Sequence, residues 1–106
     1  MNGIRLEWDK AKNIANQRKH GVSFEEASRI FYDPLRVLVA DRYVDGELRW
    51  QTLGFAGRAS GGVVLLLVAH TVREELAPGA FIEVVRIISA RKATPQERRS
   101  YADENG

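Results

Sequence analysis

The chain has 106 residues, of which 44% are hydrophobic and 28% are charged, and its formal net charge is +2. This length suits a single domain spanning residues 1–106, and the composition is typical of a folded protein rather than a disordered one. The absence of cysteine excludes disulfides and thiolate metal sites. The charged N-terminal stretch lacks the apolar run of a signal peptide, and the longest apolar run, residues 63–69, is too short to cross a bilayer. We therefore expect a soluble, cytoplasmic protein with no membrane partner.

The first third of the chain predicts a short strand followed by two helices. The strand is expected over residues 4–7, and Asp9 then suits the N-cap of a helix that runs to about Lys19 and ends at Gly21. The expected apolar stripe of this helix consists of Trp8, Ala11, Ile14 and Ala15. A second helix is expected over about residues 24–32, because residues 23–26 form a capping box and Asp33-Pro34 ends the segment. Its expected core-facing side chains are Ala27, Ile30 and Phe31.

The remainder of the chain predicts strands and one closing helix. Residues 36–43 and 48–56 are rich in β-forming side chains, and Asp45-Gly46 between them indicates a hairpin turn. Residues 63–73 and 81–91 are almost continuously apolar, as expected of central strands, with a loop over residues 74–79 between them. A second capping box, residues 94–97 with Pro95 at the first helical position, opens a short terminal helix. The element order predicts an α+β domain with a mainly antiparallel, four-stranded sheet, two N-terminal helices and a short C-terminal helix.

Basic side chains gather in two segments. Residues 86–99 hold five basic side chains and one acidic one, a net charge of +4, and residues 5–19 carry a net charge of +3. Clusters of this kind on a nearly neutral chain indicate a local site for a polyanion such as nucleic acid. The alternative is a basic surface that is simply solvated.

Two arginines in the last strand are candidates for phosphate binding. Strict alternation along the strand puts Arg86 on one face with Val84, Ile88 and Ala90, and Arg91 on the other, unless the strand bulges between them. A guanidinium group among apolar neighbours needs a partner, either an internal carboxylate such as Glu83 or Glu74, or a phosphate. For Arg91 we favour the phosphate, because this residue lies where the strand meets the N-terminus of the final helix.

His70, near the end of a predicted central strand, is a candidate for acid–base chemistry. A lone histidine on a strand is more often structural, but next to arginines it could transfer a proton in phosphodiester cleavage. Arg73 lies on the opposite pleat, so the two side chains meet only if the strand end twists. His20 ends a helix and Glu97 closes a capping box, so each has a structural role available to it. Two distant histidines without an adjacent carboxylate pattern give no metal site.

Three segments taken together resemble the BrnT family of toxins from type II toxin–antitoxin systems. They are LEWDKAKNIANQRKHGVSFEEA, DGELRWQTLG and RIISARKATPQERRSY, in this order along most of the chain. The resemblance implies a fold similar to that of RelE-type ribonucleases, cleavage of RNA without any cofactor and inhibition of translation. It also implies neutralisation by a cognate, BrnA-like ribbon-helix-helix antitoxin, and contact with operator DNA only through the toxin–antitoxin complex. The segment VREELAPGAFIEV, residues 72–84, in which residues 73–84 form the expected loop insertion, is longer and more acidic than the family pattern implies.

The resemblance also implies a set of site residues. The expected catalytic residues are His70 for proton transfer, the phosphate-binding Arg73, Arg86 and Arg91, and Glu97. The expected RNA-binding residues are Lys19, His20, Arg58, Arg98 and Tyr101. The chain is therefore predicted to be a metal-independent endoribonuclease. The alternative is a non-catalytic module with the same fold that binds an antitoxin or nucleic acid.

Overall fold

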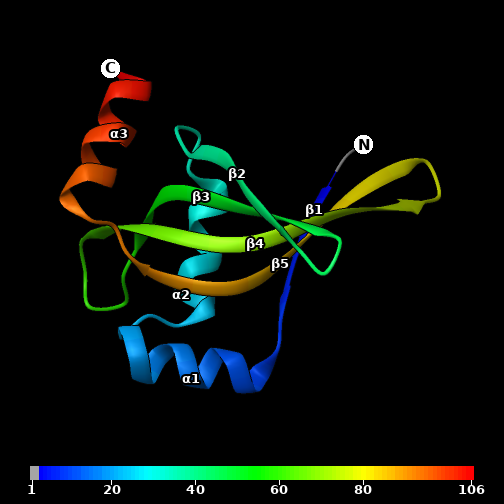
Figure 1. Ribbon diagram of the computed structural model, residues 1–106, viewed down its shortest axis with the longest axis horizontal. Helices are drawn as coiled ribbons and strands as arrows, with labels where there is room; N and C mark the ends of the chain where they lie inside the picture. Colours follow the sequence, from blue (N-terminus) through cyan, green and yellow to red (C-terminus); the bar gives the residue numbers. More distant parts are fainter. Residues whose placement is uncertain (1–2) are drawn as a thin grey trace.

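A computed structural model describes residues 3–106 as an α+β fold, with three α-helices, one 3₁₀-helix and a mixed five-stranded sheet (Figure 1). The strands are β1 (Gly3–Trp8), β2 (Val37–Val44), β3 (Glu47–Gly57), β4 (Val63–Ala77) and β5 (Ala80–Lys92). The helices are α1 (Lys10–His20), α2 (Phe24–Ser28), the 3₁₀-helix η1 (Arg29–Tyr32) and α3 (Pro95–Asn105). The predicted α+β class is confirmed. No helix within residues 3–106 is long and apolar enough to cross a membrane.

The sheet differs in detail from the predicted four-stranded antiparallel one. Its order is β1-β5-β4-β3-β2, in which β2 to β5 form an antiparallel meander and β1 adds a fifth strand parallel to β5. The prediction located β1 but gave it no partner, because a short strand carries no local signal for a pairing nearly 80 residues away. The residues between β1 and β5 therefore form a crossover. It places β1 and β5, in which the two basic segments begin, side by side at one edge of the sheet.

One face of the sheet is covered by α1, α2 and η1 and contains the main core. This helix-covered face buries Val22, Phe24, Ala27, Ile30, Phe31, Ala56, Val64, Leu66, Val68, Val85, Ile87 and Ala90. The prediction that Ala27, Ile30 and Phe31 face the core is confirmed, although the expected single helix is split into α2 and η1. Gly54 makes room for η1, since a Cβ there would lie 2.8 Å from Ile30 Cβ.

The predicted apolar stripe is wrong for the residues within α1, since Ala11, Ile14 and Ala15 are exposed, although Trp8 before the helix packs against the core. The buried side chains of this helix are Asn13 and Asn16, while Ile14 is 43% exposed. The Asn13 Oδ1 accepts a hydrogen bond from Phe24 N, and the Asn16 amide pairs with both the N–H and the C=O of Ala90 in β5. The ladder of β1 with β5 ends at Ile87, so α1 lies beside a strand edge whose backbone groups need partners. Amide side chains meet that need, and apolar ones do not.

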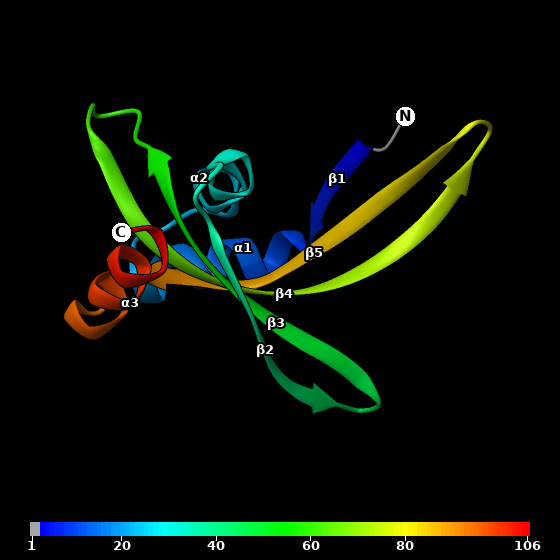
Figure 2. The same ribbon diagram turned by 90° about the horizontal axis from the view of Figure 1, so that it is seen from above.

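The opposite face, which we call the open face, is covered only at one end, by α3. There Tyr101 of α3 packs in a small cluster with Leu53, Leu65 and Leu67. The predicted capping box that starts α3 is present, with Thr94 and Glu97 exchanging side-chain-to-backbone hydrogen bonds. The rest of the open face lies over β5, β4 and β3, away from α1 and α2 (Figures 1 and 2).

Two hairpins project from the sheet as diverging arms (Figure 2). The β2–β3 hairpin turns at Asp45 and Gly46, both with positive φ, as a type I′ turn requires and as the sequence predicts. The β4–β5 hairpin turns at Pro78 and Gly79, the latter with a φ of 71°, a pair that a type II turn prefers. The loop expected over residues 74–79 is therefore mostly strand, because the ladder between β4 and β5 continues to Ala77 and Ala80.

Candidate functional site

A bulge in β5 places Arg86 and Arg91 on the same face of the sheet. Ala69 of β4 pairs with Ser89, but His70 pairs with Ile87, so Ile88 is an extra residue in the ladder. The alternation of side chains is shifted by one there, and Val85, Ile87 and Ala90 all enter the helix-covered core. Arg86 and Arg91 consequently both face the open side. They are five residues apart, which corresponds to roughly 13–16 Å along the strand, so they do not meet in one small pocket.

Arg86 lies in the middle of the open face and its guanidinium group is free. Its ladder neighbours are Thr71 of β4 and Glu7 of β1, and it borders a depression of about 260 Å³ that is also lined by Trp8 and Asp9. Within residues 3–106 it forms no hydrogen bond or ion pair, and its side chain is exposed. The internal partners considered from the sequence, Glu74 and Glu83, are not in contact with it. Arg86 is thus available to an external anion.

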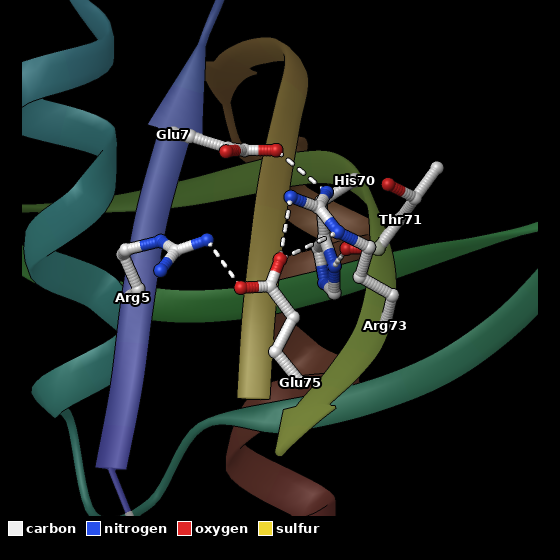
Figure 3. Close-up of polar contacts among 6 residues, drawn as sticks. All are labelled: Arg5, Glu7, His70, Thr71, Arg73 and Glu75. Atoms are coloured by element: carbon white, nitrogen blue, oxygen red, sulfur yellow. Dashed lines mark hydrogen bonds and ion pairs between the residues drawn. The ribbon is translucent and has the colours of Figure 1, made fainter. Parts of the chain in front are cut away.

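Arg73 is held by two carboxylates beside this position (Figure 3). Its Nη1 lies 2.6 Å from Glu7 Oε1 and its Nη2 lies 3.2 Å from Glu75 Oε2, while Arg5 Nη2 contacts Glu75 Oε1 at 2.8 Å. The hydrogen bond from Arg73 lowers the pKa of Glu7, and that from Arg5 lowers the pKa of Glu75, so both carboxylates are ionised at neutral pH. Arg73 therefore contributes to a network of alternating charges rather than a free binding group.

Arg91 forms a bidentate pair with Glu97. The two contacts, Nη1 to Oε1 and Nη2 to Oε2, measure 2.7 and 3.0 Å. Glu97 Oε1 also accepts a hydrogen bond from Thr94 N, so the carboxylate is fixed by the N-terminus of α3. The hydrogen bond from Arg91 lowers the pKa of Glu97. The capping box therefore fixes the orientation of the Arg91 guanidinium at the α3 end of the open face.

His70 is buried on the helix-covered face, away from the three arginines. It is 1% exposed, and its ring meets that of Phe31 edge to face at 5.0 Å. Nδ1 lies 3.3 Å from the Thr71 carbonyl, which can only accept, so Nδ1 carries the proton and Nε2 accepts from the Thr52 hydroxyl at 2.7 Å. Burial lowers its pKa to about 4, and the imidazole is neutral at pH 7. The side chain does not reach the surface on which Arg73 lies.

The basic end of α1 lies along the other edge of β5. Lys19 and His20 line a shallow depression of about 300 Å³ together with Lys12 of the same helix and with the bulged Ile88 and Ser89 of β5. These residues thus come close to the strand between Arg86 and Arg91, although they are remote from both in sequence. The RNA-binding role expected of Lys19 and His20 stays a prediction.

The other predicted RNA-binding residues are spread out. Arg58 lies just after β3, 3.3 Å from Glu26 of α2. Arg98 is exposed on α3. Tyr101 is buried, packs edge to face on Phe55, and donates a hydrogen bond to Asp33 Oδ2 at 2.7 Å. Burial, followed by this bond to Asp33, raises the pKa of Tyr101 to about 12. Its role in the structure is to anchor α3 to the body of the domain.

Arg49 of β3 is a functional candidate that the sequence analysis missed. It lies one residue beyond the last β3–β4 pair, Trp50 with His70, and alternation places it on the open face with Gln51 and Leu53. The β3–β4 ladder ends at that pair, so Arg49 begins the part of β3 that turns away from β4, on the face that also carries Thr71 and Arg86. The Nε of Arg49 is buried without a hydrogen-bond partner in the described part of the chain. The sequence signal that could have located Arg49 is the alternation in β3, which puts Arg49, Gln51 and Leu53 on one face.

The open face therefore presents cations of two kinds. Arg86 and Arg49 lack an internal carboxylate partner within residues 3–106, whereas Arg73 and Arg91 are paired and held in position. Such a surface can bind the backbone of a nucleic acid and stabilise extra negative charge on a phosphate. Among residues 3–106, no group of three or more histidine or carboxylate side chains is arranged to hold a metal ion.

One known protein family matches most of this chain. A family model described as the ribonuclease toxin, BrnT, of type II toxin–antitoxin systems matches residues 8–97. The match includes α1, the whole of β2 to β5 and the capping box of α3, and hence Arg49, Arg73, Arg86 and Arg91. No curated protein matches the chain significantly.

Proposed function

Because the chain belongs to the BrnT family of ribonuclease toxins of type II toxin–antitoxin systems, we propose that it cleaves RNA on the open face of its sheet, around Arg86, without a metal ion or cofactor. The observation that supports this position is the guanidinium group of Arg86, which forms no ion pair within residues 3–106, whereas Arg73 and Arg91 on the same face are paired with carboxylates. Arg49 of β3 lies on the same face, one residue beyond the pair of Trp50 with His70, and in this proposal it reaches the same phosphate as Arg86.

The proposed reaction uses the 2′-hydroxyl of RNA as the nucleophile. A bond forms between the 2′-oxygen and phosphorus, the bond from phosphorus to the 5′-oxygen breaks, and the proton of the 2′-hydroxyl passes ultimately to the 5′-oxygen. The phosphorane-like transition state carries more negative charge than the substrate, so guanidinium groups that are already oriented lower its free energy most. Arg86 and Arg49 bind the phosphate in this proposal, and Arg73 and Arg91 add oriented positive charge on either side.

Other predicted site residues take supporting roles in this proposal. Glu97 orients Arg91, and Lys19, His20 and Arg98 bind the flanking backbone, contacts that give affinity without sequence choice. His70 supports the underside of the sheet through Thr52 and Phe31 and is a positioning residue rather than a proton carrier. Tyr101 acts in the same indirect way, by anchoring α3.

Cleavage of labelled RNA in excess EDTA by the Arg86→Ala variant tests the proposal. We expect the wild type to remain active in the chelator and the variant to be slower by about 100-fold, the typical cost of losing one stabilising group. Unfolding should be unchanged, because Arg86 has no internal partner to lose. Arg18→Ala, an exposed change on the outer part of α1, is the matched control and should retain activity. Full activity of Arg86→Ala would overturn the assignment of the site.

The second candidate function, a non-catalytic module that binds an antitoxin, is favoured by one observation. Arg58, Arg73 and Arg91 are each paired with a carboxylate and so are partly neutralised. This candidate predicts intact RNA at all protein concentrations together with retained binding of the antitoxin. The family implies an antitoxin partner. We propose that this partner is of the BrnA-like ribbon-helix-helix type and that operator DNA is bound only through it.

A further inference from the structure

Besides the outer sides of β1 and β2, the sheet of residues 3–106 has a free edge along an inner strand. β3 pairs with β4 only as far as His70, and β1 pairs with β5 rather than with β4. In the described part of the chain, residues 71–77 of β4 therefore have β5 on one side and no strand on the other, and we call this stretch the β4 edge. Figure 2 shows the cause, since the β2–β3 arm turns away where the β4–β5 arm continues outwards. Alternate residues of such an edge direct their N–H and C=O groups outwards, ready to pair with another strand.

The tip of this hairpin also has an unusual set of side chains. Glu74 and Glu83 lie directly opposite each other, and Leu76 and Phe81 form the next pair but one on the same face. Leu76 is 80% exposed and Phe81 is 52% exposed, and Phe81 lines a depression of about 300 Å³ with both glutamates and Gly3. Neither Glu74 nor Glu83 has a hydrogen bond or ion pair within residues 3–106. Like charges in directly opposed positions destabilise a hairpin, so this pair lowers the stability of the free protein.

We propose that the antitoxin adds an extended segment to the β4 edge, with a basic side chain between two apolar ones facing Glu74. The basic group would lie next to Glu74, on the side away from Glu83 and within the field of both carboxylates, and the apolar neighbours would lie beside Val72 and Leu76 on the same face. Backbone hydrogen bonds along the edge supply the affinity in this mode of recognition, and the alternating side chains supply the choice of partner. The inference rests on the antitoxin partner that the family implies, and it is independent of where the RNA is cut.

Two other occupants fit the edge less well. An RNA backbone would bring phosphates towards Glu74 and Glu83, and exposed Leu76 and Phe81 give it no counterpart. A second copy of the chain, paired antiparallel about Glu74, would gather four carboxylates on one face. The other side of the same edge carries Thr71, Arg73 and Glu75, so an added strand would also border the proposed RNA surface. Occupation of the β4 edge therefore gives the antitoxin a route to blocking RNA.

Hydrogen–deuterium exchange of the full-length toxin, alone and with the antitoxin encoded beside it, tests the location. We expect the amides of residues 71–77 to exchange at least about tenfold more slowly in the complex, as new strand pairing requires. The internal control is β2, residues 37–44, an outer strand of the sheet, which exposes Leu38 and Val39 and should be unaffected. Protection at β2 instead, or protection of neither segment, overturns the proposal. Protection of residues 74–77 by RNA alone does so as well.

Charge reversal tests the chemistry. Glu83→Lys puts an ammonium group opposite Glu74, so we expect the melting temperature of the free toxin to rise while its affinity for the antitoxin falls by about tenfold or more. A purely structural role for Glu83 would move stability and affinity in the same direction. Glu47→Lys, the same change at the tip of the β2–β3 arm, is the matched control and should leave the affinity unchanged. Unaltered affinity of Glu83→Lys overturns the proposal.

Shortening the hairpin removes its apolar tip. Replacing residues 76–81 with Asp-Gly, the turn that this chain already uses at residues 45–46, leaves Glu75 and Ile82 paired across a two-residue turn. We expect weaker binding of the antitoxin and unchanged cleavage of RNA in the absence of antitoxin. Unchanged antitoxin binding by this variant, or a toxin dimer that is lost on shortening, overturns the proposal. Failure of RNA cleavage in the wild type would refute the proposed function alone, because both binding measurements are made without RNA.

Discussion

The substitution Asn16→Ala examines how α1 is attached to the sheet. The Asn16 side chain is buried and makes three hydrogen bonds: Nδ2 donates to Val22 O and to Ala90 O, both at 2.9 Å, and Oδ1 accepts from Ala90 N at 3.1 Å. Each contributes about 1 kcal/mol net, and more when a buried group is left unpaired. The better helix propensity of alanine returns about 0.6 kcal/mol. We therefore expect the free energy of unfolding to fall by about 3 kcal/mol.

Urea denaturation followed by circular dichroism measures this change directly. A loss of this size is a large part of the roughly 5–15 kcal/mol that stabilises a typical domain, and it corresponds to a melting temperature lower by about 10 °C. Arg18→Ala on the exposed side of the same helix is the control, with an expected effect within about 0.5 kcal/mol. The reasoning is refuted if Asn16→Ala costs less than about 1 kcal/mol, since the amide would then not be satisfying the edge of β5.

Three further predictions concern the core and the supports of the site. His70 has a pKa of about 4 in the folded protein against 6.5 unfolded, so the unfolded state binds more protons between these values and stability falls as the pH decreases through this window. Between pH 7 and pH 5 the free energy of unfolding should fall by about 2 kcal/mol, and His70→Gln should lose this dependence; an equal slope in both proteins contradicts the assignment. Tyr101→Phe removes the hydrogen bond to Asp33, so the free energy of unfolding should fall by about 1 kcal/mol while RNA cleavage is unchanged. Tyr43→Phe, at an exposed position, should change neither quantity. Loss of cleavage in a stable Tyr101→Phe protein would give the hydroxyl a direct role. Gly54→Ala would place a Cβ 2.8 Å from Ile30 Cβ, so the free energy of unfolding, measured with urea, should fall by about 1–3 kcal/mol. Gly57→Ala, where a Cβ would have no atom within 4 Å, should be tolerated. Equal effects of the two changes would show that η1 can move away.

The parts of the fold that the sequence predicted well are those in which neighbouring residues alone determine the conformation. The turn at Asp45 and Gly46, the capping box at Thr94 and the helix stop at Gly21 each depend on the conformational preference or hydrogen bonding of a local side chain. The parallel pairing of β1 with β5 and the polar inner face of α1 depend instead on which strand edge the crossover reaches. Hydrophobic periodicity contains no information about that edge, which is why Ile14 was wrongly expected in the core.

The candidate site was predictable to a similar extent. The sequence indicated that basic residues lie in β5 and at its end, and that a bulge would decide whether Arg86 and Arg91 share a face. Only the strand partners of Ala69 and His70 locate that bulge. Proton transfer by His70 was expected from residue type, whereas its burial follows from packing against Phe31 and Thr52. Arg49 was overlooked because it is isolated in sequence, and only the register of β3 with β4 puts it on the face that carries Arg86.

The extra residue in β5 sets a rule for how this chain can vary in length. Because Ile88 is the extra residue of the bulge, deleting it would leave Arg86 and Arg91 four residues apart in a regular strand and still on one face. Inserting one residue between them would instead turn every later side chain of the strand over, carrying Arg91 into the interior and Ala90 out to water. The hairpin tip follows no such rule, since two residues added to each strand there only lengthen an arm. Among natural variants of this protein, insertions should accumulate around residues 76–81 and be missing between 86 and 91.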